Sequence, residues 1–441
     1  MKVSRFAQMV AVSLFCFQAS GQMLDSHQAK YAADGQLLPW TSFRDAIDRE
    51  MNWYLKCPIE NGYPRFVWMT FMDGNYEPVQ SRLDFIPAMQ NSAGIISYLK
   101  YYEYTGNKTP AVLRFARYMG DYLVKESLTP DTGKYPRFPR STGLRGKFPQ
   151  PADAGCQRDR LYEIEPDKGG MAGYALMLLY EATGEERYRS EAVHIAKTLT
   201  ANMLAGDGDR SPWPFRVDYR TGDGRGTVSG NMTFILRLYD KLLASGYAEF
   251  QQPRAALWTW IRDYQIPSAG PKQDGRLWAQ FFEDHDDEHN RTAWAPLNLA
   301  RYLIEKKEAI DPDWKEHAHG LIEFVNQTFT SVRFGVAVSG EQDQDRIPWG
   351  GVNSTYGAVL AMYSAATGSP EYRSIARQAL TLCLYAVEDD GHPFDTIGDR
   401  RGRGWQEDAH TDKIHNIVDA ITAFPEWANW TGIIDAGVKT R

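Results

Sequence analysis

The chain has 441 residues, of which 43% are hydrophobic and 24% are charged, and its formal net charge is −7. This is the composition of an ordinary globular protein with enough length for a large core, so it excludes a low-complexity or disordered chain. The acidic balance excludes the basic surface with which proteins bind nucleic acid, and we expect no nucleic-acid partner.

The first 21 residues have the pattern of a secretory signal peptide. Lys2 and Arg5 form a short basic head, residues 9–17 are largely apolar, and small residues follow at 19–21. The apolar run is too short to span a bilayer, and no later run is long enough. We therefore predict a signal peptide at 1–21 and an exported protein, periplasmic or secreted, with no membrane partner after signal cleavage.

Beyond the signal, two kinds of helical pattern alternate along the chain. One amphipathic helix begins near Ser42, five helix pairs follow with turns near residues 105, 183, 245, 307 and 367, and a last helix begins near Thr411. The first helix of a pair is apolar almost all round, as in 169–182, whereas the second has a single apolar stripe. We predict that the first helix of each pair is buried on all sides and the second on one side only.

One of these turns recurs later in the chain. The stretch TGEERYRSEA begins at Thr183 and TGSPEYRSIA begins at Thr367, with glycine where a helix would end. Twelve helices that alternate in this way fit an all-α (α/α)6 toroid, in which six inner helices stand inside six outer ones and the terminal helices close the ring. We assign one domain to 22–430 and a C-terminal tail to 431–441, and an open helical solenoid is the alternative architecture.

The connections between the predicted helices differ in length. Those from an inner to an outer helix are short, often only Thr-Gly, whereas those from an outer to an inner helix are long and carry most of the acidic, basic and aromatic clusters. In a closed ring, all the long connections emerge on one face, at the N-terminal ends of the inner helices. The sequence therefore predicts a single funnel-shaped site at this face.

The residue types in these long connections suit carbohydrate chemistry. Aromatic rings stack on the apolar faces of sugars, and arginine makes two-pronged contacts to a uronate carboxylate. Two carboxyl groups can cleave a glycosidic bond, one as acid and the other as base or nucleophile. The candidate catalytic residues are Asp84, Glu163, Glu165, Asp167 and Asp408. The candidate substrate-binding residues are Arg82, Arg160, His285, Trp349, Asn353, Trp405 and His410.

Several of these clusters also have a structural interpretation. Asp167 could cap the helix that follows it, and Arg82 with Asp84 could form a structural ion pair. The HDDEH stretch that begins at His285 lacks the glutamate and third ligand of a zinc peptidase, which favours a polar loop. The EQDQD stretch from Glu341 lacks the glycine of an EF-hand calcium loop. We predict no metal and no cofactor.

The six-hairpin organisation and the turn YEATGEERY at 180–188 resemble those of the (α/α)6-toroid glycosidases and lyases. Over residues 40–430 the chain looks nearest to uronic-acid enzymes, namely the glucuronidases of glycoside hydrolase family 154 and the unsaturated glucuronyl and rhamnogalacturonyl hydrolases. The unsaturated-uronyl hydrolases use carboxylates near the second and fourth helices. The resemblance thus implies catalytic roles for Asp84 and for one or more of the acids from Glu163 to Asp167.

The first functional hypothesis is an exported glycoside hydrolase that removes a uronic acid, with β-glucuronic acid as the favoured sugar, so the expected partner is a carbohydrate. The second is a polysaccharide lyase, in which Arg400, Arg401 and Arg403 neutralise a uronate while His410 or Tyr162 takes the C5 proton. The third is a helical ring that binds a glycan or docks a protein without catalysis.

Overall fold

The computed structural model of the chain describes residues 23–25, 27–64, 70–72, 78–81, 86–141, 160, 162–281, 287–395, 397 and 411–432. The lyase arginines Arg400, Arg401 and Arg403 lie outside these ranges, and so do six of the candidate catalytic and substrate-binding residues. They are Arg82, Asp84, His285, Trp405, Asp408 and His410.

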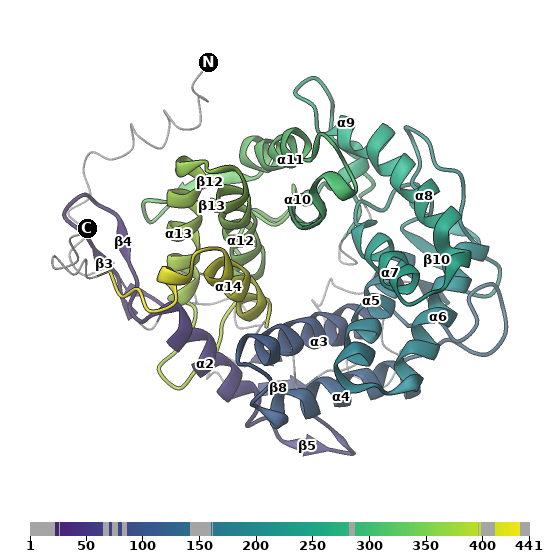
Figure 1. Ribbon diagram of the computed structural model, residues 1–441, viewed down its shortest axis with the longest axis horizontal. Helices are drawn as coiled ribbons and strands as arrows, with labels where there is room; N and C mark the ends of the chain where they lie inside the picture. Colours follow the sequence, from purple (N-terminus) through teal and green to yellow (C-terminus); the bar gives the residue numbers. More distant parts are fainter. Residues whose placement is uncertain are drawn as a thin grey trace.

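Within the described residues, twelve helices form two concentric rings (Figure 1). The inner helices are α3 (Pro87–Tyr104), α5 (Pro166–Thr183), α7 (Thr233–Ala244), α10 (Trp294–Lys306), α12 (Gly350–Thr367) and α14 (Asp412–Ala423). The outer helices are α2 (Phe43–Tyr54), α4 (Pro110–Lys125), α6 (Glu186–Ala201), α8 (Gln251–Trp260), α11 (Trp314–Thr328) and α13 (Pro370–Leu384). A π-helical turn at Ile261–Gln265 extends α8 into the short α9 (Ile266–Ser268). The predicted all-α (α/α)6 toroid is therefore confirmed.

The inner ring is closed. Each inner helix packs on the next in the order α3, α5, α7, α10, α12 and α14, and α14 then packs on α3. The terminal pair, α14 and α2, also pack together, as the other hairpins do. Closure rules out the open solenoid.

The burial pattern explains why the two rings form. Every residue of α12 from Gly350 to Ala361 is buried, so this helix needs neighbours on all sides. By contrast, α6 buries one stripe that includes Tyr188, Ile195 and Leu199, and its remaining faces are polar. The predicted division into fully buried and one-sided helices is confirmed for these two helices. None of the described helices is long and apolar enough to cross a membrane.

The repeated turn closes two of the hairpins. Gly184 ends α5 with φ 69° and Gly368 ends α12 with φ 79°, in the left-handed region that favours glycine. In each case the glycine N–H donates to a carbonyl in the last turn of the helix, from Tyr180 or Ser364 respectively. The repeated sequence therefore forms the same turn between two helices at both places.

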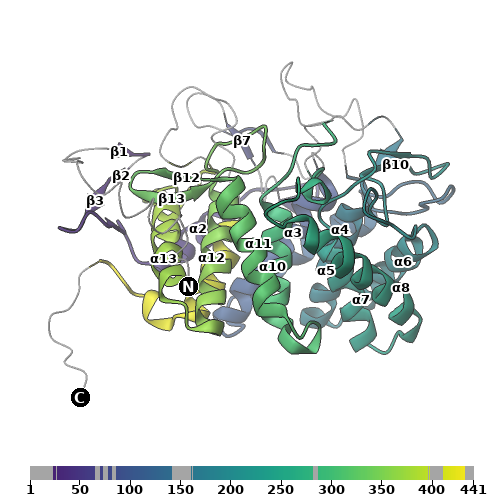
Figure 2. The same ribbon diagram turned by 90° about the horizontal axis from the view of Figure 1, so that it is seen from above.

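Short strands, which the sequence analysis did not predict, lie at the opposite end of the helices, where the long connections run (Figure 2). One three-stranded sheet joins β9 (Glu163–Ile164), β10 (Arg216–Asp218) and β11 (Gly224–Arg225). The hairpins are β1 (Met23–Leu24) with β2 (His27–Gln28), β3 (Lys30–Tyr31) with β4 (Leu37–Leu38), β5 (Ile59–Glu60) with β6 (Tyr63–Pro64), β7 (Thr70–Met72) with β8 (Pro78–Ser81), and β12 (Thr330–Arg333) with β13 (Val336–Ser339).

The close approach of α5 and α7 gives a test of the ring packing. A Cβ at Gly170 would lie 2.3 Å from Cγ1 of Ile235 and 3.2 Å from its Cα, so α7 would have to move. We expect Gly170→Ala to lower the free energy of unfolding by about 1–3 kcal/mol, measured by urea denaturation.

The matched control is Gly320→Ala on the outer helix α11, where an added Cβ meets no atom within 4 Å. This change should stabilise the protein by about 0.5–1 kcal/mol, because alanine favours a helix more than glycine does. A Gly170→Ala protein as stable as the control would contradict the close helix packing.

Candidate functional site

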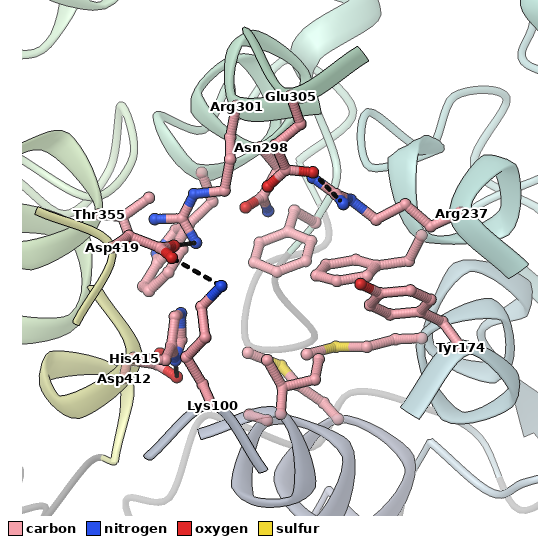
Figure 3. A pocket seen from close by; sticks show the side chains of 17 residues that line it. Lys100, Tyr174, Arg237, Asn298, Arg301, Glu305, Thr355, Asp412, His415 and Asp419 are labelled. Carbon is pink, nitrogen blue, oxygen red and sulfur yellow. Dashed lines mark hydrogen bonds and ion pairs between the residues drawn. The ribbon is translucent and has the colours of Figure 1, made fainter. Parts of the chain in front are cut away.

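The inner helices enclose a central cavity of about 770 Å³, including its open mouth. Figure 3 shows its wall, to which all six inner helices contribute. The aromatic lining residues are Tyr174, Phe234, Phe281 and Trp294, and the charged ones are Lys100, Arg237, Arg301, Glu305, Asp412 and Asp419. His415, Asn298 and Thr355 add further polar groups. Aromatic faces and hydrogen-bonding groups in one cavity are the combination that binds sugars.

Ion pairs fill the deep end of this cavity. The carboxylate of Asp419 forms an ion pair with Lys100 at 2.8 Å and lies 3.6 Å from Nη1 of Arg301, so one carboxylate pairs with two cations. Arg237 bonds Glu305 at 2.6 Å. Lys100, Glu305 and Asp419 lie about two turns or more into their helices, which places them away from the N-terminal mouth. We call these five residues the charged floor, which has three cations against two carboxylates.

His415 lies on α14 above the charged floor. Its Nδ1 is 2.8 Å from the hydroxyl of Ser97 on α3 and 3.9 Å from Oδ1 of Asp412. Burial, together with the nearby charges of Arg301 and Lys100, holds the pKa of His415 well below its usual value. The imidazole is therefore uncharged at pH 7. His410, the candidate chosen from this segment, lies outside the described residues, and the structure places His415 in the cavity.

The three predicted carboxylates at the start of α5 lie together, beside the cavity wall. Glu163 on β9 accepts hydrogen bonds from Arg225 at 2.9 and 2.6 Å. Glu165 lies 3.2 Å from Lys168 and 3.5 Å from Arg216, and all three of these groups are buried. Glu163, Glu165 and Asp167 are not among the described residues that line the central cavity.

Lys168 links this carboxylate group to the cavity. Its ammonium lies 3.3 Å from Asp167, donates to the main-chain oxygen of Phe281 and stands 4.0 Å from the centre of the Phe281 ring. Phe281 lines the cavity, so the α5 carboxylates hold part of its wall through Lys168.

The pKa shifts of two of these carboxyls have opposite directions. Burial raises the pKa of Asp167 despite the opposing charge of Lys168. Burial also acts to raise the pKa of Glu163, but hydrogen bonds from Arg225 and from the backbone of Arg160 outweigh it and lower that pKa. The alternative of Asp167 as a helix cap is wrong, because the N-cap of α5 is Glu165 and Asp167 lies inside the first turn.

The other predicted binding residues within the described chain have structural contacts. Arg160 is exposed and lies 3.8 Å from Glu163. Trp349 precedes α12, and its indole N–H donates to Asp345 at 3.0 Å. Asn353 is fully buried and exchanges two hydrogen bonds with the backbone of Ser339, which ties β13 to α12.

A second group of buried charges lies at the start of α14. It consists of Glu50 from α2, Asp395 from the connection after α13, and Asp412 and Lys413. Lys413 donates to the main-chain oxygen of Phe394 at 2.5 Å, and Asp395 accepts from the N–H of Gly351 at 2.7 Å. Burial raises the pKa of Glu50 to about 8 and that of Asp395 to about 6, in both cases against the attraction of Lys413. Among the described residues, no group of three or more His, Cys, Asp or Glu side chains has the arrangement of a metal site.

No protein-family model matches this chain, and no curated protein matches its sequence. Solved structures do match. A sugar epimerase from a ruminal bacterium aligns with a TM-score of 0.63 at 12% identity, covering 87% of this chain and 98% of that one. A family 76 glycoside hydrolase from a bovine Bacteroides thetaiotaomicron strain gives 0.57 at 12% identity, covering 88% and 78%.

An unsaturated glucuronyl hydrolase specific for heparin aligns with a TM-score of 0.55 at 10% identity, covering 87% of this chain and 97% of that one. Because the identities are this low, the alignments concern the fold alone. The chain has the (α/α)6-toroid fold of these enzymes.

The buried carboxyl of Glu50 leads to a test by pH. Its pKa of about 8 in the folded protein lies above the ordinary value of 4.5, so the folded state binds the proton more tightly than the unfolded state. Stability is therefore greatest at low pH for this group, falls as pH rises from 4.5 to about 8, and levels off above that. We expect Glu50→Gln to remove this decline, and so to be more stable than the wild type at pH 8 by up to about 3–5 kcal/mol.

Urea denaturation at pH 5, 6.5 and 8 measures this effect. Asp395, with its pKa of about 6, should still lower stability between pH 4 and 6 in the variant. The control is Glu181→Gln, which removes an exposed carboxylate and should leave the pH dependence as it is in the wild type. Equal slopes for wild type and Glu50→Gln between pH 6 and 8 would contradict the assignment.

Proposed function

We propose that the protein is an exported glycoside hydrolase that removes a uronic acid, with β-glucuronic acid as the first choice, from the end of a glycan. The charged floor carries this proposal. Three cations face two carboxylates there, so a ligand carboxylate would balance the surplus positive charge. Tyr174, Phe234 and Trp294 offer faces for the sugar ring above it.

The position of the floor also supports action on a chain end. A glycan would enter at the mouth and place its terminal ring against ion pairs that join α3, α10 and α14 on one side and α7 and α10 on the other. The carboxylates proposed for catalysis are Asp84, Glu163, Glu165, Asp167 and Asp408. Of these, Asp167 has a pKa that burial raises, and it is linked to the cavity wall through Lys168. Export rests on the signal peptide predicted at 1–21.

Aryl β-glucuronides test the activity directly. We expect release of the aryl alcohol from the glucuronide at least about tenfold faster than from the matching β-glucoside, because one buried charge-assisted contact contributes more than 1.4 kcal/mol. Arg301→Met should raise KM for the glucuronide by about tenfold or more and leave the slow glucoside reaction unchanged.

Failure to cleave any aryl glycoside across pH 4–9 would sink the proposal. A lyase would instead form an unsaturated product from a uronate polymer. A new absorbance at about 232 nm, which is typical of that product, would assign the lyase reaction.

His415 favours a second candidate function, proton transfer at a sugar carbon. Only an uncharged imidazole can act as the base at the C–H bond beside an aldehyde, and the lowered pKa keeps His415, held through Nδ1 by Ser97, in that form. This is the chemistry of an aldose isomerase or epimerase, and a sugar epimerase is among the proteins of similar fold.

Incubation with free aldoses in D2O distinguishes this function from hydrolysis. Proton transfer predicts deuterium at C2 of the sugar, detected by NMR, and a loss of exchange of about 100-fold or more in His415→Gln. His194→Asn is the control, because His194 lies on the outer helix α6 and bonds the carbonyl of Pro136. Absence of deuterium in every aldose would reject this candidate.

A further inference from the structure

Asp412 is the first residue of α14 and lines the central cavity beside His415 (Figure 3). Only 4% of the residue is exposed, and its Oδ1 lies 3.9 Å from Nδ1 of His415. A Cβ at Gly351 would lie 3.1 Å from the Trp294 ring and 3.4 Å from Oδ2 of Asp412, so both side chains close over this glycine. Asp412 therefore combines a carboxyl group with an aromatic wall at the mouth of the cavity.

The other two carboxylates of the cavity have a different position. Glu305 and Asp419 belong to the charged floor, where they hold Arg237 and Lys100 at 2.6 and 2.8 Å. Asp412 precedes Asp419 by seven residues on the same helix, which corresponds to about 10 Å along the axis. This separation leaves room for one sugar ring between the charged floor and Asp412.

Buried groups behind the cavity wall fix the start of α14. Lys413 is fully buried and donates to Phe394, and Asp395 binds the N–H of Gly351 at the start of α12. Glu50 lies behind them, and with its carboxyl protonated at neutral pH it adds no negative charge next to Asp412. The start of α14 is thus held by the connection that carries Phe394 and Asp395, which is itself fixed to α12 through Gly351, and this is the rigid support that a reacting side chain needs.

We propose that Asp412 is the catalytic carboxylate that takes the proton from the attacking water, an assignment that rests on the proposed glycosidase function. The water oxygen bonds to the anomeric carbon as its proton passes to Asp412. The C–O bond to the leaving group breaks, its electron pair stays on the leaving oxygen, and that oxygen takes a proton from one of the carboxyls proposed above for catalysis. Asp412 then releases its proton to solvent and that carboxyl takes one from solvent, so atoms and charge balance.

The experiment uses the full-length protein and an aryl β-glucuronide. Asp412→Asn should lower kcat by about 100-fold or more, and sodium formate or azide should restore part of the activity of Asp412→Ala, because a small anion can replace the missing carboxylate. With azide, the product should be the glycosyl azide. Asp412→Glu retains the charge beside Lys413 and serves as the folded variant if the neutral ones unfold, and we expect its kcat to fall by about tenfold or more.

The matched control is Asp240→Asn, which removes a carboxylate that binds Arg254 and Tyr302 outside the cavity. Its kcat should stay within about twofold of the wild type. Two results with an active wild type would overturn the role of Asp412 and leave the glycosidase function in place. One is that Asp412→Asn is also active, and the other is that the variants are folded but no anion restores their activity. A wild type inactive on all aryl glycosides overturns the glycosidase function, and the assignment of Asp412 with it.

Discussion

The packing of α14 against α3 is the contact on which the rest of the structure depends. The helices α3 and α14 bury residues on most of their faces, polar ones included, so each needs neighbours on both sides, and the ring closes where they meet. The seam also builds the site. The contact of Ser97 with His415 and the ion pair of Lys100 with Asp419 both cross it. An open arrangement of the same helices would separate these residues, so burial of the apolar faces and assembly of the cavity are one event.

The helices α5 and α14 each have a buried lysine in their first turn. Lys168 and Lys413 are fully buried cations in the first turn of a helix, where the helix dipole disfavours positive charge. Each follows an aspartate and donates to the main-chain oxygen of a phenylalanine, Phe281 or Phe394, in a connection at the mouth. Because a buried charge requires hydrogen-bonding partners, each lysine fixes its connection in one position. The walls of the mouth are therefore held by internal charges.

The cavity combines two environments that suit different parts of one ligand. Aromatic side chains form an uncharged part of the wall, and the charged floor has one more cation than carboxylate at the deep end. His415 lies between them, neutral because it is buried near Arg301 and Lys100. A sugar acid would meet the floor with its carboxylate and the wall with its ring. His415 would serve a reaction at a sugar carbon, whereas the proposed hydrolysis depends on Asp412.

The sequence by itself determined the helices and their two kinds of burial, because apolar periodicity and glycine turns are local properties that α5, α6 and Gly184 display within a few turns of chain. It favoured a ring over an open solenoid, and the structure showed that the ring closes. It also predicted that Glu163, Glu165 and Asp167 would gather at one helix start. Only the tertiary structure decided which polar groups face the cavity. Lys100, Arg237 and Arg301 look like ordinary charges on helices, and Asp412 and His415 resemble any polar residues in a first turn. Whether such a side chain points into the ring depends on how the helix is rotated against its neighbours, which is set by packing with residues hundreds of positions away.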